Sequence, residues 1–120
     1  MQPYERLLAW QQCHALTLLV YRVSASWPAA ERYALTSQIR RAATSAPTNI
    51  AEGSAKKGKR EFRRYLDIAL GSLAEVSYLL LLARDLNLLS AIDWEEVEAG
   101  RLVRPACDPR HDAKRDCPII

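Results

Sequence analysis

The stretch of sequence that decides the fold runs from Leu35 to Glu75 and reads LTSQIRRAATSAPTNIAEGSAKKGKREFRRYLDIALGSLAE. Its apolar residues recur at alternating intervals of three and four, which is the spacing of a helix that buries one face. A basic segment between Gly53 and Gly58 interrupts this spacing. The stretch therefore predicts two helices joined by a short connection, and it contains no catalytic signature.

The first of these helices has a proline inside it. Its apolar face is formed by five residues, Leu35, Ile39, Ala42, Ala46 and Ile50. Thr36 or Ser37 would cap its N-terminus, unless the helix begins earlier, within residues 31–34. Pro47 cannot donate to the carbonyl of Ala43. We expect a kink at Pro47 rather than a break, because the apolar spacing continues across it.

The second helix is predicted from Lys59 to about Leu88 and keeps the same spacing. Further leucines and isoleucines make it apolar on more than one side. A single face of a small bundle needs fewer apolar residues. We therefore expect this helix to be central, buried against another subunit, or both.

Shorter helical patterns flank this pair. The upstream pattern should end at Trp27, because the residue before Pro28 avoids helical backbone. The downstream pattern begins after a cap at Ser90 or Asp93 and should stop by Pro105. We predict an all-α, antiparallel up-and-down four-helix bundle with a short fourth helix over residues 1–104, followed by an irregular or disordered tail over residues 105–120.

Composition favours one cytoplasmic domain. A length of 120 residues suits a single domain, and 49% apolar residues suffice for a core. We expect no transmembrane helix and no signal peptide, since long uncharged apolar runs are absent and the N-terminal segment is charged and amphipathic. The three cysteines form no evident disulfide framework.

Positive charge is concentrated between Arg32 and Arg64, where nine Lys or Arg accompany two acidic residues, while the whole chain has a net charge of +3. The densest part comprises Lys56, Lys57, Lys59, Arg60, Arg63 and Arg64. Lys56, Arg60 and Arg64 are spaced four apart, so they would share one helix face and could not neutralise one another. Such a patch attracts polyanions, and the alternative is a solvated basic surface.

The stretch resembles a family of four-helix-bundle proteins encoded in intervening sequences of bacterial 23S ribosomal RNA genes. The resemblance covers residues 5–98 and rests mainly on three strings: Tyr33-x-Leu35-Thr36-x-Gln38-Ile39-Arg40-Arg41-Ala42-Ala43, Ser45-x-Pro47-x-Asn49-Ile50-Ala51-Glu52-Gly53, and Leu66-x-Ile68-Ala69-x-Gly71-Ser72-x-x-Glu75.

The resemblance implies a left-handed four-helix bundle that commonly assembles as a homopentamer and has no recognised catalytic residues. Accessory proteins of diversity-generating retroelements look similar, and they are basic and associate with nucleic acid and with a reverse transcriptase. This chain departs from the family at Arg104-Pro105, where other members continue the fourth helix.

Five polar residues are candidates for structural or interface contacts: Arg40, Arg41, Asn49, Glu52 and Glu75. If the two long helices are antiparallel, either arginine lies within one turn of Glu75 and could pair with it, the alternative being phosphate contact. Asn49 could satisfy backbone groups freed by Pro47 or bond to the facing helix. Glu52 and Glu61 would come level, as in an acid–base pair, but no histidine or metal cluster accompanies them.

A few other side chains have chemistry of interest. Tyr65 could stack on a base, and His14 should be a packed or interfacial histidine. Cys107, His111 and Cys117 have zinc-donor types, but their spacing fits no standard finger and a fourth ligand is missing. We expect no metal and no cofactor.

These observations predict a non-enzymatic homo-oligomer that binds RNA or DNA, or acts as a scaffold, through its basic end. The alternative is a protein–protein interaction module that does not bind nucleic acid.

Overall fold

The computed structural model describes residues 2–101, and within them the chain is all-α, with four α-helices and two short 3₁₀ helices. In chain order the elements are η1 (Pro3–Arg6), α1 (Leu8–Ser24), η2 (Ala29–Glu31), α2 (Leu35–Ser54), α3 (Lys59–Asp85) and α4 (Ala91–Arg101). The tail predicted over residues 105–120, and with it Cys107, His111 and Cys117, lies outside the described residues.

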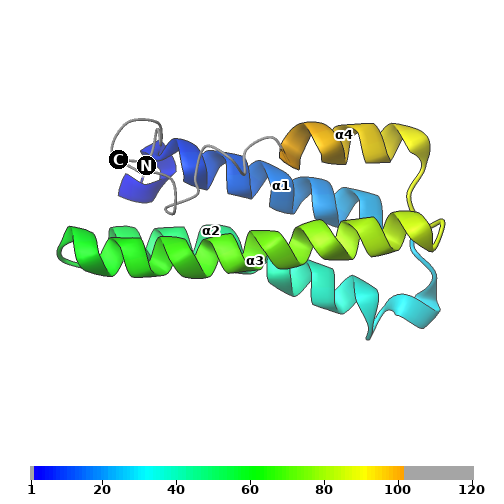
Figure 1. The fold of residues 1–120 in the computed structure, drawn as a ribbon, viewed down its shortest axis with the longest axis horizontal. Coiled ribbons are helices and arrows are strands. Elements are labelled where there is room, and N and C mark those ends of the chain that lie inside the picture. The colour runs from blue at the N-terminus through cyan, green and yellow to red at the C-terminus, as the bar shows by residue number, and fades with distance from the viewer. Residues whose placement is uncertain (1, 102–120) are drawn as a thin grey trace.

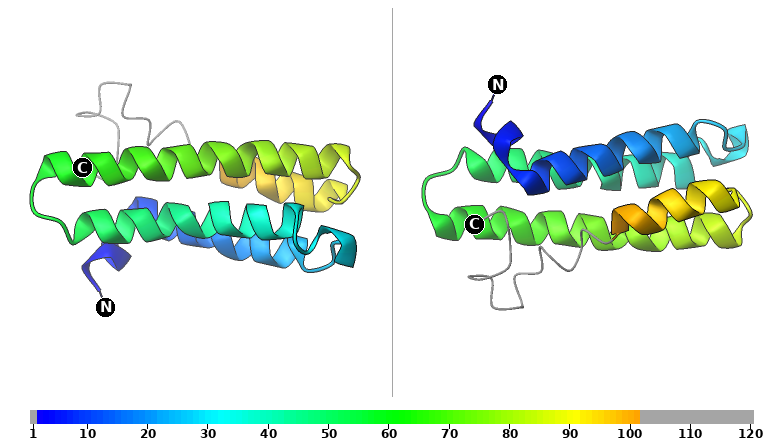
Figure 2. Two further views of the ribbon diagram at one scale, coloured as in Figure 1. Left: turned by 90° about the horizontal axis from the view of Figure 1, so that it is seen from below. Right: turned by 90° about the horizontal axis from the view of Figure 1, so that it is seen from above.

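The two longest helices, α2 and α3, form a hairpin that runs the length of the molecule (Figure 1). These two helices lie side by side, and the chain reverses direction in the short connection between them (Figure 2). The helix α1 packs along α2, whereas α4 contacts α1 and α3 near the end opposite this connection. The short fourth helix therefore covers only part of the bundle's length.

The core has two clusters, one at each end of the bundle. The cluster near α4 contains large residues such as Trp27, Ile39 and Leu80, together with Val97 of α4 itself. The cluster near the α2–α3 connection is built mostly from small residues, Ala9, Cys13, Ala46, Ile50, Ala69 and Leu73. All five predicted apolar positions of α2 are buried, so the spacing of the sequence identified its core face correctly.

The helix α3 is apolar well beyond its core face. It contains an 18-residue window with a mean hydropathy of 1.7, so by length and composition it could cross a membrane, although core helices of soluble proteins pass the same test. Only 33% of that window is buried. Ile68 and Tyr78 on this helix are 42% and 61% exposed. From its apolar residues the sequence analysis predicted that this helix is central, buried against another subunit, or both. The exposed apolar face on α3 is where another subunit could pack.

The helix ends differ from prediction in three places. α1 stops at Ser24, and a turn then carries Trp27 into the core. α2 begins at Leu35 after Ala34, which makes no side-chain cap, so Thr36 and Ser37 lie inside the helix. α3 stops at Asp85, because Asn87 adopts a left-handed φ of 60° and the N–H of Leu88 reaches back to the carbonyl of Ala83 at 2.9 Å.

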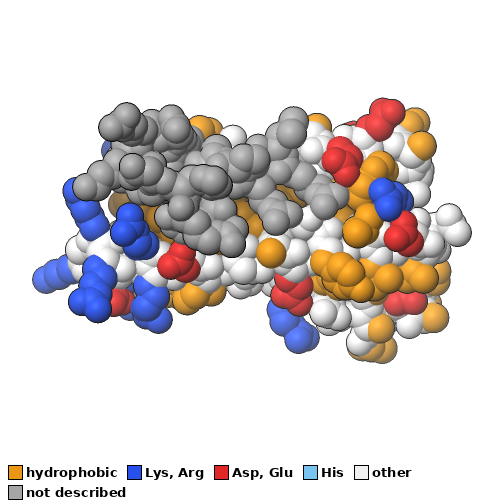
Figure 3. Space-filling model, in the orientation of Figure 1, with side chains coloured by type: hydrophobic (Ala, Val, Ile, Leu, Met, Phe, Trp, Pro, Cys, Tyr) orange, Lys and Arg blue, Asp and Glu red, His pale blue; other side chains and the backbone are white. Residues whose placement is uncertain are grey.

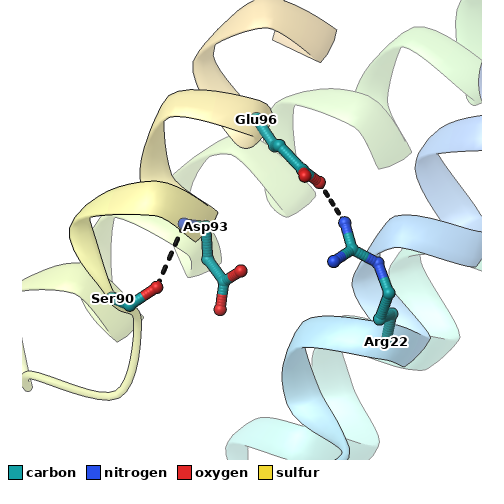
Figure 4. A network of polar contacts seen from close by, with 4 residues as sticks. All are labelled: Arg22, Ser90, Asp93 and Glu96. Atoms are coloured by element: carbon teal, nitrogen blue, oxygen red, sulfur yellow. Dashed lines mark hydrogen bonds and ion pairs between the residues drawn. The ribbon is translucent and has the colours of Figure 1, made fainter.

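Three contacts hold α4 in place. Of the two predicted caps, Ser90 is the one formed, and its hydroxyl oxygen accepts from the N–H of Asp93 at 3.1 Å (Figure 4). Glu96 forms an ion pair with Arg22 of α1 (Figure 4). The guanidinium of Arg84 lies 4.5 Å from the ring centre of Trp94. The helix is thus tied to both of its neighbours.

Candidate functional site

The six clustered basic residues, two in the α2–α3 connection and four at the start of α3, are all exposed and lie together at one end of the molecule. Figure 3 shows Lys and Arg side chains gathered over this end. We call this surface the basic end, defined by Lys56, Lys57, Lys59, Arg60, Arg63 and Arg64. Among the described residues one ion pair reaches it, between Arg64 and Glu61 at 3.5 Å.

The backbone at Gly58 divides the basic end into two parts. Gly58 has a φ of +91°, a conformation that favours glycine, and α3 begins directly after it. Lys56 and Lys57 therefore belong to the turn. The prediction that Lys56 and Arg60 share a helix face is wrong, because Lys56 precedes Gly58 in the turn and Arg60 lies on α3.

The helices α2 and α3 approach each other closely at Gly53. A Cβ atom built on Gly53 would lie 2.6 Å from the Cβ of Tyr65 and 3.1 Å from Cδ2 of Phe62. Glycine is therefore needed here for α2 and α3 to approach each other. The ring of Tyr65 lies beneath two cations, with Arg64 at 4.9 Å and Lys56 at 5.9 Å from its centre. A base that stacked on a face of Tyr65 over which a cation lies would have to displace that cation.

Arg40 turns away from α3, so the ion pair expected with Glu75 is not formed by this residue. Its Nε donates to the hydroxyl oxygen of Ser24 at 2.9 Å, and its guanidinium lies 4.6 Å from the ring centre of Tyr21. Both partners belong to α1. Adjacent helix positions point about 100° apart, so Arg40 and Arg41 cannot both face α3. Arg40 joins α1 to α2.

Arg41 and Glu75 do lie in the same place, a groove of about 510 Å³ between α2 and α3. They form no ion pair within the described structure. Glu75 instead accepts from Nε2 of Gln38 at 3.2 Å. The groove is polar and open, and Ser45 and Ser72 also line it. The sequence placed the two charged residues at the right level but did not identify Gln38 as the partner.

Pro47 is accommodated by a residue that the sequence analysis did not single out. The helix continues across Pro47, and the carbonyl of Ala43 accepts a hydrogen bond from Oγ1 of Thr17 at 2.8 Å. Thr17 is buried on α1 and also lies 2.9 Å from the carbonyl of Cys13. A threonine on the core face of α1 was the only available signal.

Asn49 does not replace the bond lost at Pro47. Its Nδ2 donates to the carbonyl of Ser45 at 2.8 Å and to the Ser45 hydroxyl at 3.1 Å. The hydroxyl of Ser72 on α3 donates to the same Ser45 oxygen at 2.8 Å. Asn49 is thus connected to α3 through Ser45. Glu52 is exposed and has no ion pair in the part of the chain that the structure describes.

Residues 5–100 match the family model described as 23S rRNA-intervening sequence protein. The chain belongs to this family. No curated protein matches the sequence. The match includes the basic end, Pro47 and its partner Thr17, and the groove with Arg41 and Glu75.

The 23S rRNA-intervening sequence protein family is not a known enzyme family. Its match ends at residue 100, next to the last described residue of α4. Within residues 2–101 no three His, Cys, Asp or Glu side chains are grouped so that they could hold a metal ion.

Proposed function

We propose that this protein is a cytoplasmic, homo-oligomeric nucleic-acid-binding or scaffold protein that contacts the phosphates of RNA or DNA through its basic end. The observation that carries the proposal is the gathering of six exposed cations at one end of the bundle, with one ion pair among the described residues to offset them. Phosphate contact neutralises such cations and releases counterions.

Helix electrostatics support a functional origin of this charge. Lys59 and Arg60 lie in the first turn of α3, where the positive end of the helix dipole disfavours cations. Glu61 is the single acidic residue in that turn. Cations at this helix end lower the stability of the monomer, so the fold alone does not explain them. Binding of a polyanion does explain them, because its negative charge offsets the repulsion.

The outer face of α3 is the proposed site of assembly. Ile68, Gly71, Glu75, Tyr78 and Leu82 follow one another at alternating intervals of three and four on this helix, and most of them are exposed. The neighbouring groove holds Arg41 and Glu75 without an ion pair between them, so each is available to the opposite charge of another copy. A lipid partner is disfavoured, because Glu75 would be buried in hydrocarbon.

The family resemblance implies that each subunit is a left-handed, antiparallel bundle and that five subunits assemble. Such a homopentamer would place five basic ends in one particle. Five copies carry about thirty cations, if the basic ends lie on the same side of a ring. The local potential then rises with subunit number, and binding becomes steeply dependent on salt. Proximity of identical sites would also increase avidity for a long polyanion.

The nucleic-acid part is tested with matched charge reversals. Arg60→Glu removes a cation from the basic end, while Arg32→Glu changes net charge equally at the other end of the bundle, just after η2. We expect fluorescence anisotropy with a labelled RNA to show weaker binding for Arg60→Glu, with a salt slope reduced by about 0.7–0.9 per lost phosphate contact. Equal effects of both changes would contradict the basic end as the site.

The assembly part is tested by light scattering. A mass near five times 13.6 kDa supports the pentamer. Tyr78→Asp should reduce this mass, whereas Leu18→Asp, at an almost equally exposed position on α1, should leave it unchanged. Assembly that survives Tyr78→Asp would remove this face as the interface. A stable oligomer that ignores RNA at low salt would favour the protein-interaction module instead.

A further inference from the structure

Three aromatic rings form a stack near the N-terminus that the basic end does not explain. The rings of Tyr4 and Trp10 have their centres 5.0 Å apart and are tilted by 57°. Trp10 and His14 are stacked nearly parallel, with centres 4.9 Å apart and 12° between the ring planes. Tyr4 and Trp10 are half-buried, and His14, one helical turn beyond Trp10, is exposed. The stack therefore ends in a ring that faces solvent.

The position of this stack is fixed by local structure. Tyr4 belongs to η1, and Nε2 of Gln11 on α1 donates to the carbonyl of Glu5 at 2.8 Å, which ties η1 to α1. The rings are consequently held before any ligand arrives. A preorganised aromatic surface loses little conformational freedom when a flat ligand stacks on it.

The stack and the basic end share one end of the bundle. η1 packs against both α1 and α2. Figure 2 shows η1 beside the end of α2 from which the connection to α3 leaves. Arg6, at the end of η1, adds an exposed cation on this side. Exposed aromatic rings next to a basic surface are the combination with which proteins bind single strands.

We propose that the stack of Tyr4, Trp10 and His14 is a base-stacking platform for single-stranded nucleic acid. A base that stacks on His14 extends the pile of rings, while the adjoining phosphates run toward the basic end. This inference rests on the proposed nucleic-acid function and narrows its ligand to single strands. In a duplex, neighbouring base pairs cover the faces of the bases, so a duplex has only its terminal faces to offer.

The test compares two oligonucleotides that have the same phosphates. One is a short single-stranded DNA, and the other is its abasic counterpart, which has no rings to stack. We expect the protein to bind the abasic strand at least about 5-fold more weakly, which corresponds to the loss of one stacked base. His14→Ala should weaken binding of the normal strand by a similar factor and leave binding of the abasic strand unchanged.

Ile92→Ala is the control, because Ile92 is 72% exposed and lies on α4, at the far end of the bundle. This change should affect neither strand. Equal, salt-sensitive binding of the normal and abasic strands would overturn the stacking platform and leave the proposed phosphate binding intact. Binding of neither strand at low salt would overturn both. The comparison of strands uses the unmodified protein, so it decides the matter even if a variant folds poorly.

Discussion

Replacing Thr17 by valine tests how the fold tolerates a proline in the middle of α2. Valine has nearly the shape of threonine but has no hydroxyl, so the change leaves little cavity. Ala43 is 1% exposed, and its carbonyl accepts from Oγ1 of Thr17 at 2.8 Å, in place of the N–H that Pro47 lacks. Thr17→Val leaves this carbonyl buried without a donor, whereas Cys13 keeps the backbone donor of its own helix.

The expected cost follows from the chemistry of a buried, unsatisfied acceptor. Loss of such a partner destabilises a protein by about 1–3 kcal/mol. The decisive measurement repeats the change in a Pro47→Ala background. Alanine at this position supplies an N–H to Ala43, so Thr17→Val should then cost less, by about 1–2 kcal/mol, and the two changes should be coupled rather than additive.

Urea unfolding followed by circular dichroism provides the four free energies of unfolding. The dependence of each free energy on urea concentration should be unchanged, because none of the variants alters the surface exposed on unfolding. If Thr17→Val costs the same with proline and with alanine at position 47, the Thr17 hydroxyl does not compensate for the missing N–H, and the explanation of Pro47 given above is wrong.

Three further predictions address the hairpin, α4 and the buried thiol. Gly53→Ala should destabilise the fold by about 1–2 kcal/mol in urea unfolding, because the new methyl group meets the Cβ of Tyr65 at 2.6 Å. Gly71→Ala is the control: no atom lies within 4 Å of the new methyl group, so this change should stabilise the dilute monomer by about 0.5–1 kcal/mol. Ser90→Ala should cost about 1 kcal/mol and speed hydrogen exchange in the first turn of α4. Burial raises the pKa of the Cys13 thiol from 9.0 to about 11, so the neutral thiol favours the folded state. The contribution of this thiol to the free energy of unfolding should be full below pH 9 and be lost between pH 9 and 11. Denaturation at graded pH should show a smaller decline for Cys13→Ala.

Helix existence and core faces were predictable because both depend on spacing along one chain segment. The apolar positions of α2 are buried as predicted, and the cap at Ser90 is one of the two expected. Helix ends were less predictable, because they depend on local alternatives. Asn87 ends α3 through its left-handed backbone, and nothing in the apolar spacing marks that position.

Side-chain partners were predicted less well, because they depend on the rotation of each helix as well as on the level of each residue. Counting from the turn placed Arg40 and Arg41 opposite Glu75, but the rotation of α2 directs Arg40 to Ser24 on α1 and leaves Arg41 in the groove. The bond from Thr17 to Ala43 joins residues 26 positions apart. Such a contact follows only once α1 and α2 are placed relative to each other.

The two ends of the bundle differ in a way that bears on function. The end with α4 has large core residues, and two helix caps stabilise it. Asn87, with its left-handed backbone, ends α3, and Ser90 caps the N-terminus of α4. The basic end has a core of mostly small residues and a helix N-terminus that carries cations against its dipole. Stability alone would favour acidic residues at Lys59 and Arg60. If nucleic-acid binding maintains these cations, their replacement by glutamate should leave the fold at least as stable and should weaken binding. A loss of stability would instead mean that the cations serve the fold.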